Sequence, residues 1–143
     1  MDRAMKDFQI SPYGAEHFEG VKMLWREAFP DDPPWNAAQV AVPAKLAVQP
    51  ELFLIAVDGD IVIGSIMAGY DGHRGWLYAV AVLNSHRRRG VGAAMVRDAE
   101  DRLRSMGCHK INLQVRASNA AVVEFYKRLG YAIEERVSMG KRI

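Results

Sequence analysis

The sequence of 143 residues predicts an α/β fold, in which a mixed, strongly twisted sheet of about six or seven strands packs against about four helices. The apolar run Tyr78–Leu83 predicts a buried strand, and the 3.6-residue spacing of apolar residues after Gly90 predicts an amphipathic helix. Two apolar runs flank Asp58-Gly59-Asp60, which is typical of a hairpin turn. After the helix that follows Gly90, Ile111–Val115 returns as a strand, and a strand-helix-strand passage of this kind requires a right-handed parallel crossover, so the sheet should be mixed.

The composition is that of one globular domain, residues 1–143. Half of the residues are hydrophobic and a quarter are charged, and a chain of this length can bury a stable core. The net charge of +2 favours no general nucleic-acid partner. The first ten residues lack the apolar core of a signal peptide, and no apolar run is long enough to cross a membrane. A single cysteine, Cys108, cannot form an internal disulfide, so we expect a cytoplasmic protein without a membrane partner.

The N-terminal part should hold an edge strand and two helices. Residues 7–11 predict the strand, and apolar side chains at helical spacing predict a helix from about Ala15 to Phe29. Prolines exclude a helix over Pro30–Asn36. Asn36 is then expected to cap a second helix, which Pro43 must kink or restart.

The middle of the chain predicts an antiparallel meander followed by a long helix. Leu52–Val57 and Ile61–Tyr70 form the hairpin, and a turn at 71–75 leads into a strand at 76–83. The helix from Gly90 to Met106 should end at Gly107 and bury one apolar face. Its expected core residues are Val91, Ala94, Met95, Ala99, Leu103 and Met106.

The C-terminal part predicts a strand, a helix and a short tail. Ile111–Val115 has the pattern of a strand, and Ser118 or Asn119 is placed to cap the next helix, which Gly130 ends. The tail, residues 131–143, has room for one strand or two short ones.

The loop between the strand at 76–83 and the long helix has the composition of a phosphate site. It reads Arg87-Arg88-Arg89-Gly90-Val91-Gly92. The first N–H groups of a helix bind anions, glycines allow a phosphate to approach the backbone, and arginines neutralise its charge. The loop lacks the third glycine of a Rossmann motif and the Gly-Lys-Ser/Thr of a Walker loop.

Arg87, Gly90 and Gly92 fit the pattern Arg/Gln-x-x-Gly-x-Gly/Ala. This loop therefore resembles the acyl-coenzyme-A pyrophosphate loop of the GNAT superfamily of N-acetyltransferases. A second stretch resembles the other GNAT signature, because a strand ends at Asn119 and Tyr126 follows seven residues later.

The resemblance covers about the last two thirds of the chain, and the segment Ala68–Gly75 resembles the bacterial YpeA-type branch. It implies a single-domain GNAT-like fold in which the strands at 76–83 and 111–115 splay apart. It also implies acetyl-CoA as cosubstrate, with the acetyl group passed directly to a primary amine in a ternary complex.

The same resemblance implies roles for individual residues. Backbone groups of Val80, Ala81 and Val82 would bind the pantetheine arm, and Arg87-Arg88-Arg89-Gly90-Val91-Gly92 the diphosphate. Tyr126 would contact the cofactor and donate a proton to the departing sulfur, although it could instead be an aromatic packed on the sheet. Asn119 would bind the pantetheine, cap its helix, or both.

The acceptor side is less defined. The loop between the first two helices borders the acceptor site in GNAT proteins, so Trp35 and Asn36, with Tyr70 and Tyr78, are the candidate substrate-binding residues. The alternative for the first two is a solvated loop with Trp35 pinned on the core.

No general base can be assigned from the sequence. Gln114 stands where some protein N-terminal acetyltransferases carry a glutamate, and an amide cannot accept the proton. Asp71, His73, Tyr78 and a water molecule remain candidates. The other histidines have no metal-ligand spacing, so a metal is not expected.

Three other functions compete with amine acetylation by acetyl-CoA. The chain could be a protein N-terminal, ribosomal-protein-type acetyltransferase, or a non-catalytic CoA-binding regulatory module. Residues 87–89 could alternatively contact nucleic acid, which the modest net charge does not favour. The oligomeric state, monomer or homodimer, is open, as is the identity of the amine.

Overall fold

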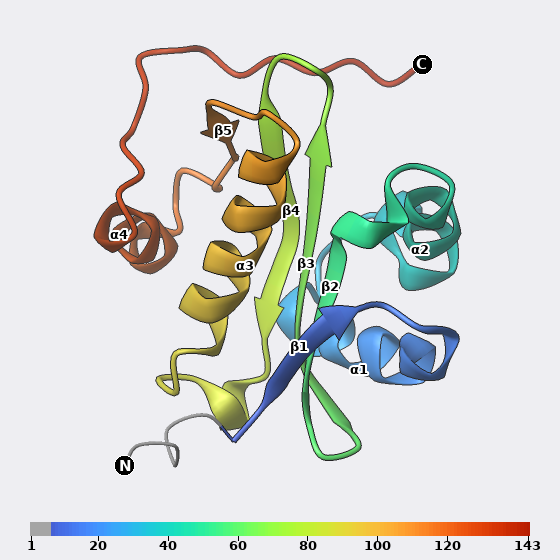
Figure 1. Ribbon diagram of the computed structural model, residues 1–143. Coiled ribbons are helices and arrows are strands. Elements are labelled where there is room, and N and C mark those ends of the chain that lie inside the picture. The colour runs from blue at the N-terminus through green and yellow to red at the C-terminus, as the bar shows by residue number, and fades with distance from the viewer. Residues whose placement is uncertain (1–6) are drawn as a thin grey trace. The chain divides into compact units, whose positions relative to one another are not determined.

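The computed structural model describes residues 7–143, which fall into two compact units that divide after Leu113. The first unit contains a five-stranded sheet in the order β1-β2-β3-β4-β5 (Figure 1). All neighbours are antiparallel except β4 and β5, which are parallel. The strands are β1 (Gln9–Pro12), β2 (Phe53–Asp58), β3 (Ile61–Tyr70), β4 (Gly75–Val82) and β5 (Ile111–Asn112).

The predicted mixed sheet is confirmed, but the expected number of six or seven strands is wrong, since the described residues form five. The strand expected at 111–115 is only Ile111–Asn112. It pairs with β4 at two positions, Gly75–Ile111 and Trp76–Asn112. The strands therefore part beyond Trp76, in agreement with the splay that the resemblance implies.

Three α-helices of the first unit cover the two faces of the sheet (Figure 1). They are α1 (Phe18–Ala28), α2 (Ala38–Leu46) and α3 (Val91–Ser105). A 3-10 turn at Ala15–His17 precedes α1 and completes the predicted first helix. Figure 1 shows α3 on one face of the sheet and both α1 and α2 on the other.

The entry into α2 differs from the expectation in two details. Ala37, and not Asn36, is the N-cap residue, because Pro34–Asn36 closes as a short 3-10 turn before the helix begins. Pro43 lies inside α2 without dividing it. Only five helical residues precede Pro43, so its missing N–H removes a single intrahelical hydrogen bond near the start.

The apolar faces of the helices and the sheet form the core. On the α1 and α2 side this core includes Val21, Leu24, Trp25, Val42, Phe53, Ile55, Met67 and Ala81. On α3 the buried residues are Val91, Met95, Val96, Ala99 and Leu103. Met106 was expected in the core but is exposed, because α3 ends at Ser105 and Met106 lies beyond its last turn.

The second unit, Gln114–Ile143, contains one helix, α4 (Ala120–Arg128). Asn119 caps it as predicted, since its Oδ1 accepts from the Val122 N–H at 3.4 Å. Gly130 follows the helix with φ of +98°, the left-handed backbone expected of a glycine stop. Within the part of the chain described, no helix is both long enough and apolar enough to span a membrane.

The tail forms no strand over residues 131–143, so the expectation of one or two strands is wrong. The apolar side chains that would have formed a strand face, Ile133, Val137 and Met139, are all exposed. Without apolar burial, nothing offsets the conformational entropy lost when such a segment is ordered as a strand.

Candidate active site

The candidate site is organised around β4, which lies between β3 and β5 in the sheet and precedes α3 in the chain. Its side facing β5 is paired only as far as Trp76, so on that side no strand among the described residues pairs with residues 77–82. A bulge interrupts its other side, where the β3 register shifts between Ser65 and Met67. Ala79 lies in this bulge with φ of +50°, an uncommon conformation for a residue other than glycine.

Two hydrogen bonds support the bulge from within the core. The hydroxyl of Ser65, which is fully buried, donates to the Ala79 carbonyl at 2.8 Å and accepts from the indole N–H of Trp25 at 2.9 Å. The indole is itself buried on α1. Sequence reasoning missed this chain of contacts. A serine in the middle of the apolar run Ile61–Tyr70 was the signal that could have indicated it.

The segment after β4 connects this strand to the start of α3. Gly90 is the N-cap residue of α3 with φ of +79°, and no side chain caps the helix. A β-carbon built on Gly90 would meet nothing within 4 Å. The first hydrogen bond of α3 runs from the Ala94 N–H to the Gly90 carbonyl. The N–H groups of residues 91–93 therefore have no acceptor within the helix.

The three arginines before this helix differ in their surroundings. All are exposed, and Arg88 has φ of +67°. Arg89 forms a 3.3 Å ion pair with Asp7. Within residues 7–143, Arg87 and Arg88 have no ion-pair partner, so their charges are available near the start of α3.

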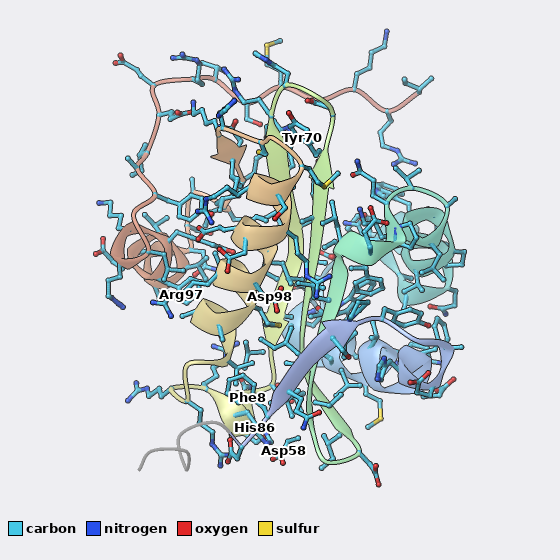
Figure 2. The ribbon with its side chains drawn as sticks, viewed as in Figure 1. Phe8, Asp58, Tyr70, His86, Arg97 and Asp98 are labelled. Atoms are coloured by element: carbon cyan, nitrogen blue, oxygen red, sulfur yellow. The ribbon has the colours of Figure 1, made fainter. Side chains whose placement is uncertain are left out.

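Carboxylates hold the segment that precedes the arginines. The Asn84 N–H donates to Glu27 on α1 at 2.6 Å, and His86 Nε2 lies 2.9 Å from Asp58 Oδ2 at the end of β2. His86 Nδ1 is 2.8 Å from the Ser85 hydroxyl. Figure 2 shows His86 and Asp58 together at one end of the sheet, with Tyr70 at the opposite end. No sequence pattern indicated this contact between His86 and Asp58.

The turn between β3 and β4 holds two of the predicted site residues, Asp71 and His73, and a third, Tyr70, is the last residue of β3. Asp71 accepts hydrogen bonds at 2.7 Å from the backbone N–H groups of His73 and Arg74, and these bonds lower the pKa of its carboxyl group. The Tyr70 hydroxyl lies 3.2 Å from the carbonyl oxygen of Gly72 and 3.4 Å from that of Gly107, and its single O–H can donate to either. A strand rises about 3.3 Å per residue, so seven steps along β4 separate this turn from the arginine loop by roughly 23 Å.

Tyr78 and the loop before α2 lie on the side of the sheet covered by α1 and α2. Tyr78 is about half exposed, and burial of the remainder raises the pKa of its phenol. A cavity of about 310 Å³ lies between α1 and the start of α2. Asn36 lines it together with Trp25, Arg26, Phe29 and Asp32, whereas Trp35 is exposed and does not belong to its lining. The Asn36 amide donates to Asp32 at 3.5 Å.

The remaining predicted residues lie in the second unit. Tyr126 is buried on α4, with its ring 4.9 Å from that of Phe125 and 5.6 Å from that of Tyr131. Burial raises the pKa of Tyr126 to about 12. The phenol is therefore protonated over the whole physiological range. Asn119 performs the capping role described above.

Residues 7–143 contain no group of three or more His, Cys, Asp or Glu side chains arranged to hold a metal ion.

The order of the sheet, its one parallel pair and the helix that follows β4 define a mixed α/β fold. The acetyltransferase (GNAT) family matches residues 18–131. An acetyltransferase of Yersinia pestis (strain Pestoides F) is 38% identical over 137 residues, which cover 94% of this chain and 95% of the relative. The chain belongs to the acetyltransferase (GNAT) family, and it is an acetyltransferase.

Two solved structures extend the comparison. AAC(6')-Iy in complex with the bisubstrate analogue CoA-S-monomethyl-acetylneamine is similar with a TM-score of 0.79 at 20% identity, over 95% of this chain and 98% of that one. The NatC complex bound to Gag peptide and CoA is similar with a TM-score of 0.78 at 26% identity, over 92% of this chain and 88% of that one.

Proposed function

We propose that this protein transfers an acetyl group from acetyl-CoA to a primary amine by direct attack within a ternary complex. The observation that carries the proposal is the unpaired edge of β4, together with the start of α3 at Gly90, which no side chain caps and which follows β4 in the chain. Family membership supplies the reaction class. The bisubstrate analogue bound to AAC(6')-Iy supports attack within a ternary complex, because it joins the two substrates in one molecule.

The diphosphate of the cosubstrate is proposed to bind the loop from Arg87 to Gly92. Unpaired N–H groups at the start of α3 and the exposed guanidinium groups of Arg87 and Arg88 suit an anion. The space above Gly90 allows a phosphate to approach the backbone. The pantetheine arm would then run back along Val80–Val82 and use the backbone groups that β5 leaves unpaired.

Catalysis would depend first on proximity, since holding an amine and a thioester in attack geometry removes much of the entropic barrier. Backbone N–H groups of β4, such as that of Val82, would polarise the carbonyl. Tyr126 is proposed to donate to the departing sulfur. Its pKa of about 12 keeps the phenol protonated, and the proton released by the amine would restore it after transfer.

The general base is best described as a water molecule relayed by backbone carbonyls. Asp71 is disfavoured as the base, because its pKa is lowered and its Oδ1 already accepts two hydrogen bonds within the turn. Both Asp71 and His73 lie in the turn at the far end of β4 from the arginine loop. Tyr78, by contrast, lies within the part of β4 that β5 leaves unpaired.

The acceptor is proposed to lie near Tyr78, Tyr70 and the loop carrying Trp35 and Asn36. Both a small amine and a peptide remain candidates, since AAC(6')-Iy was solved with an acetylneamine analogue and NatC with a peptide. The protein N-terminal alternative is less favoured, because the Gln114 side chain cannot act as a base. We further propose one domain over residues 1–143 and a cytoplasmic location, the former supported by a family match that spans both units.

The decisive experiment is titration calorimetry with acetyl-CoA on a matched pair of glycine variants. Gly90→Ala and Gly59→Ala both place an alanine at positive φ with no neighbour within 4 Å, but Gly59 lies in the hairpin between β2 and β3. Both variants should lose about 1 kcal/mol of stability. Only Gly90→Ala should weaken acetyl-CoA binding, by about tenfold or more.

A screen for CoA release over amines, amino acids and N-terminal peptides would then identify the acceptor. Equal acetyl-CoA affinity of the two glycine variants, or no binding by the wild type, would refute the proposed site.

A further inference from the structure

Lys45 on α2 is a half-buried amine held over the sheet. Its Nζ donates to the carbonyl oxygen of Ala68 on β3. A β-carbon built on the next residue, Gly69, would lie 4.0 Å from both Lys45 Nζ and Tyr78 Cε2, so the amine and the phenol ring converge above this glycine. Burial lowers the pKa of Lys45, against an opposing effect of Glu51, and so increases the fraction of neutral amine.

The register of the sheet places this amine beside the open part of β4. Ala68 pairs with Leu77, and Met67 pairs with Tyr78. Leu77 is the first residue of β4 beyond the pairing with β5. Neighbouring strands are about 4.8 Å apart, so the Ala68 backbone, whose carbonyl holds Lys45 Nζ, lies about one strand spacing from Leu77, where the open part of β4 begins.

This placement matters if the proposed function is correct, on which the inference rests. With the diphosphate at the start of α3 and the pantetheine arm along Val80–Val82, the thioester would arrive close to Tyr78 and Ala79. A primary amine of the protein itself then stands near the acetyl group. The flexible four-carbon stem of a lysine allows its amine to reach over such a distance.

We propose that Lys45 is a site of self-acetylation. Its neutral amine would attack the carbonyl carbon of the thioester, so that a C–N bond forms and the C–S bond breaks. The proton lost by the nitrogen passes to the sulfur, CoA leaves as the free thiol, and the lysine becomes an uncharged amide. No other reactant is required.

Other lysines of the described chain provide controls. Lys22 pairs with Glu19 at 3.4 Å and Lys127 pairs with Glu124 at 3.6 Å, and neither of these pairs involves the sheet. Chemical acetylation by a thioester in solution should modify the amine of Lys127, whose side chain is 48% exposed, at least as fast as Lys45. Enzymatic self-acetylation should favour Lys45.

The experiment is a time course of purified protein with acetyl-CoA, followed by intact mass and by peptide mapping. The first acetyl group should appear on Lys45, at a rate per chain that does not depend on protein concentration. Lys45→Arg should abolish this first event, and Lys127→Arg should leave it unchanged. S-acetyl-N-acetylcysteamine, a thioester without the nucleotide, should modify Lys45 at least about tenfold more slowly.

Three results would overturn the inference: modification of Lys22 or Lys127 as fast as Lys45, equal labelling by the truncated thioester, or a rate that rises with protein concentration. Calorimetry separates this failure from failure of the proposed function. If acetyl-CoA binds but Lys45 stays unmodified, only self-acetylation is refuted. If acetyl-CoA does not bind, both proposals fail.

Discussion

Replacing Ser65 by alanine tests whether the buried contacts to the β4 bulge stabilise the protein. The variant leaves the Trp25 indole N–H without an acceptor and removes a donor from the Ala79 carbonyl. A hydrogen bond contributes about 1 kcal/mol net, and a buried polar group left unsatisfied costs about 1–3 kcal/mol more. Ser65→Ala should therefore lower the free energy of unfolding by about 2–4 kcal/mol, a large part of the stability of an ordinary domain.

Urea denaturation measures this loss directly, with an unchanged m-value as the sign that the variant still folds as wild type. Ser105→Ala is the matched control, because the Ser105 hydroxyl donates to the backbone carbonyl of Asp101 on the exposed side of α3. That variant should change stability by less than about 0.5 kcal/mol. In a Trp25→Phe background, where the indole donor is absent, Ser65→Ala should have a smaller effect.

Acetyl-CoA affinity provides the functional readout for the same variant. If the bulge positions the open edge of β4, Ser65→Ala should weaken binding while Ser105→Ala does not. A loss of stability below about 0.5 kcal/mol for Ser65→Ala would show that these hydrogen bonds do not hold the bulge.

Three further predictions concern titratable residues. Burial raises the pKa of Tyr126 from 10.0 to about 12. The contribution of its protonated phenol to the free energy of unfolding is therefore complete below pH 10 and lost as the pH rises towards 12. Wild type should thus lose about 1.4 kcal/mol relative to Tyr126→Phe by about pH 11, measured by urea denaturation. The pKa of Asp71 is lowered, so its effect on stability has the opposite pH dependence. The stability difference between wild type and Asp71→Ala should be present at neutral pH and vanish as the pH falls below 3.8, as followed by thermal unfolding. His86→Ala and Asp58→Ala should each lower stability by about 1–2 kcal/mol. The double variant should lose less than their sum, since both remove one contact, and additive losses would show that the contact is not stabilising.

Local signals predicted most of the fold. The turn at Gly59, the helix from Gly90 and the helix stops at Gly107 and Gly130 depend on backbone conformations that the residues themselves favour, and the structure has positive φ at all four glycines. Long-range arrangements were harder to predict. Whether the tail pairs with a sheet depends on an apolar surface elsewhere in the chain, which sequence periodicity does not reveal.

The candidate site shows the same division. Arg87, Gly90 and Gly92 carry a contiguous pattern, so the sequence alone predicts the loop that we propose as the anion-binding site. Lys45 and Tyr78 are more than thirty residues apart, and only the packing of α2 on the sheet brings them together above Gly69. The role of Asp71 in its turn was hidden for another reason: an aspartate that accepts backbone hydrogen bonds and one that acts as a base look identical in a sequence.

The distribution of carboxylates around the arginine loop explains how it can be both ordered and strongly cationic. Glu27 accepts from the Asn84 backbone, Asp58 contacts His86, and Asp7 pairs with Arg89. Each of these acids thus contacts a group other than Arg87 or Arg88. No carboxylate among residues 7–143 pairs with Arg87 or Arg88, so their positive charge and that of the helix N–H groups favour a ligand that brings its own negative charge. Because these groups are solvent-exposed, binding of a diphosphate there should weaken with rising salt.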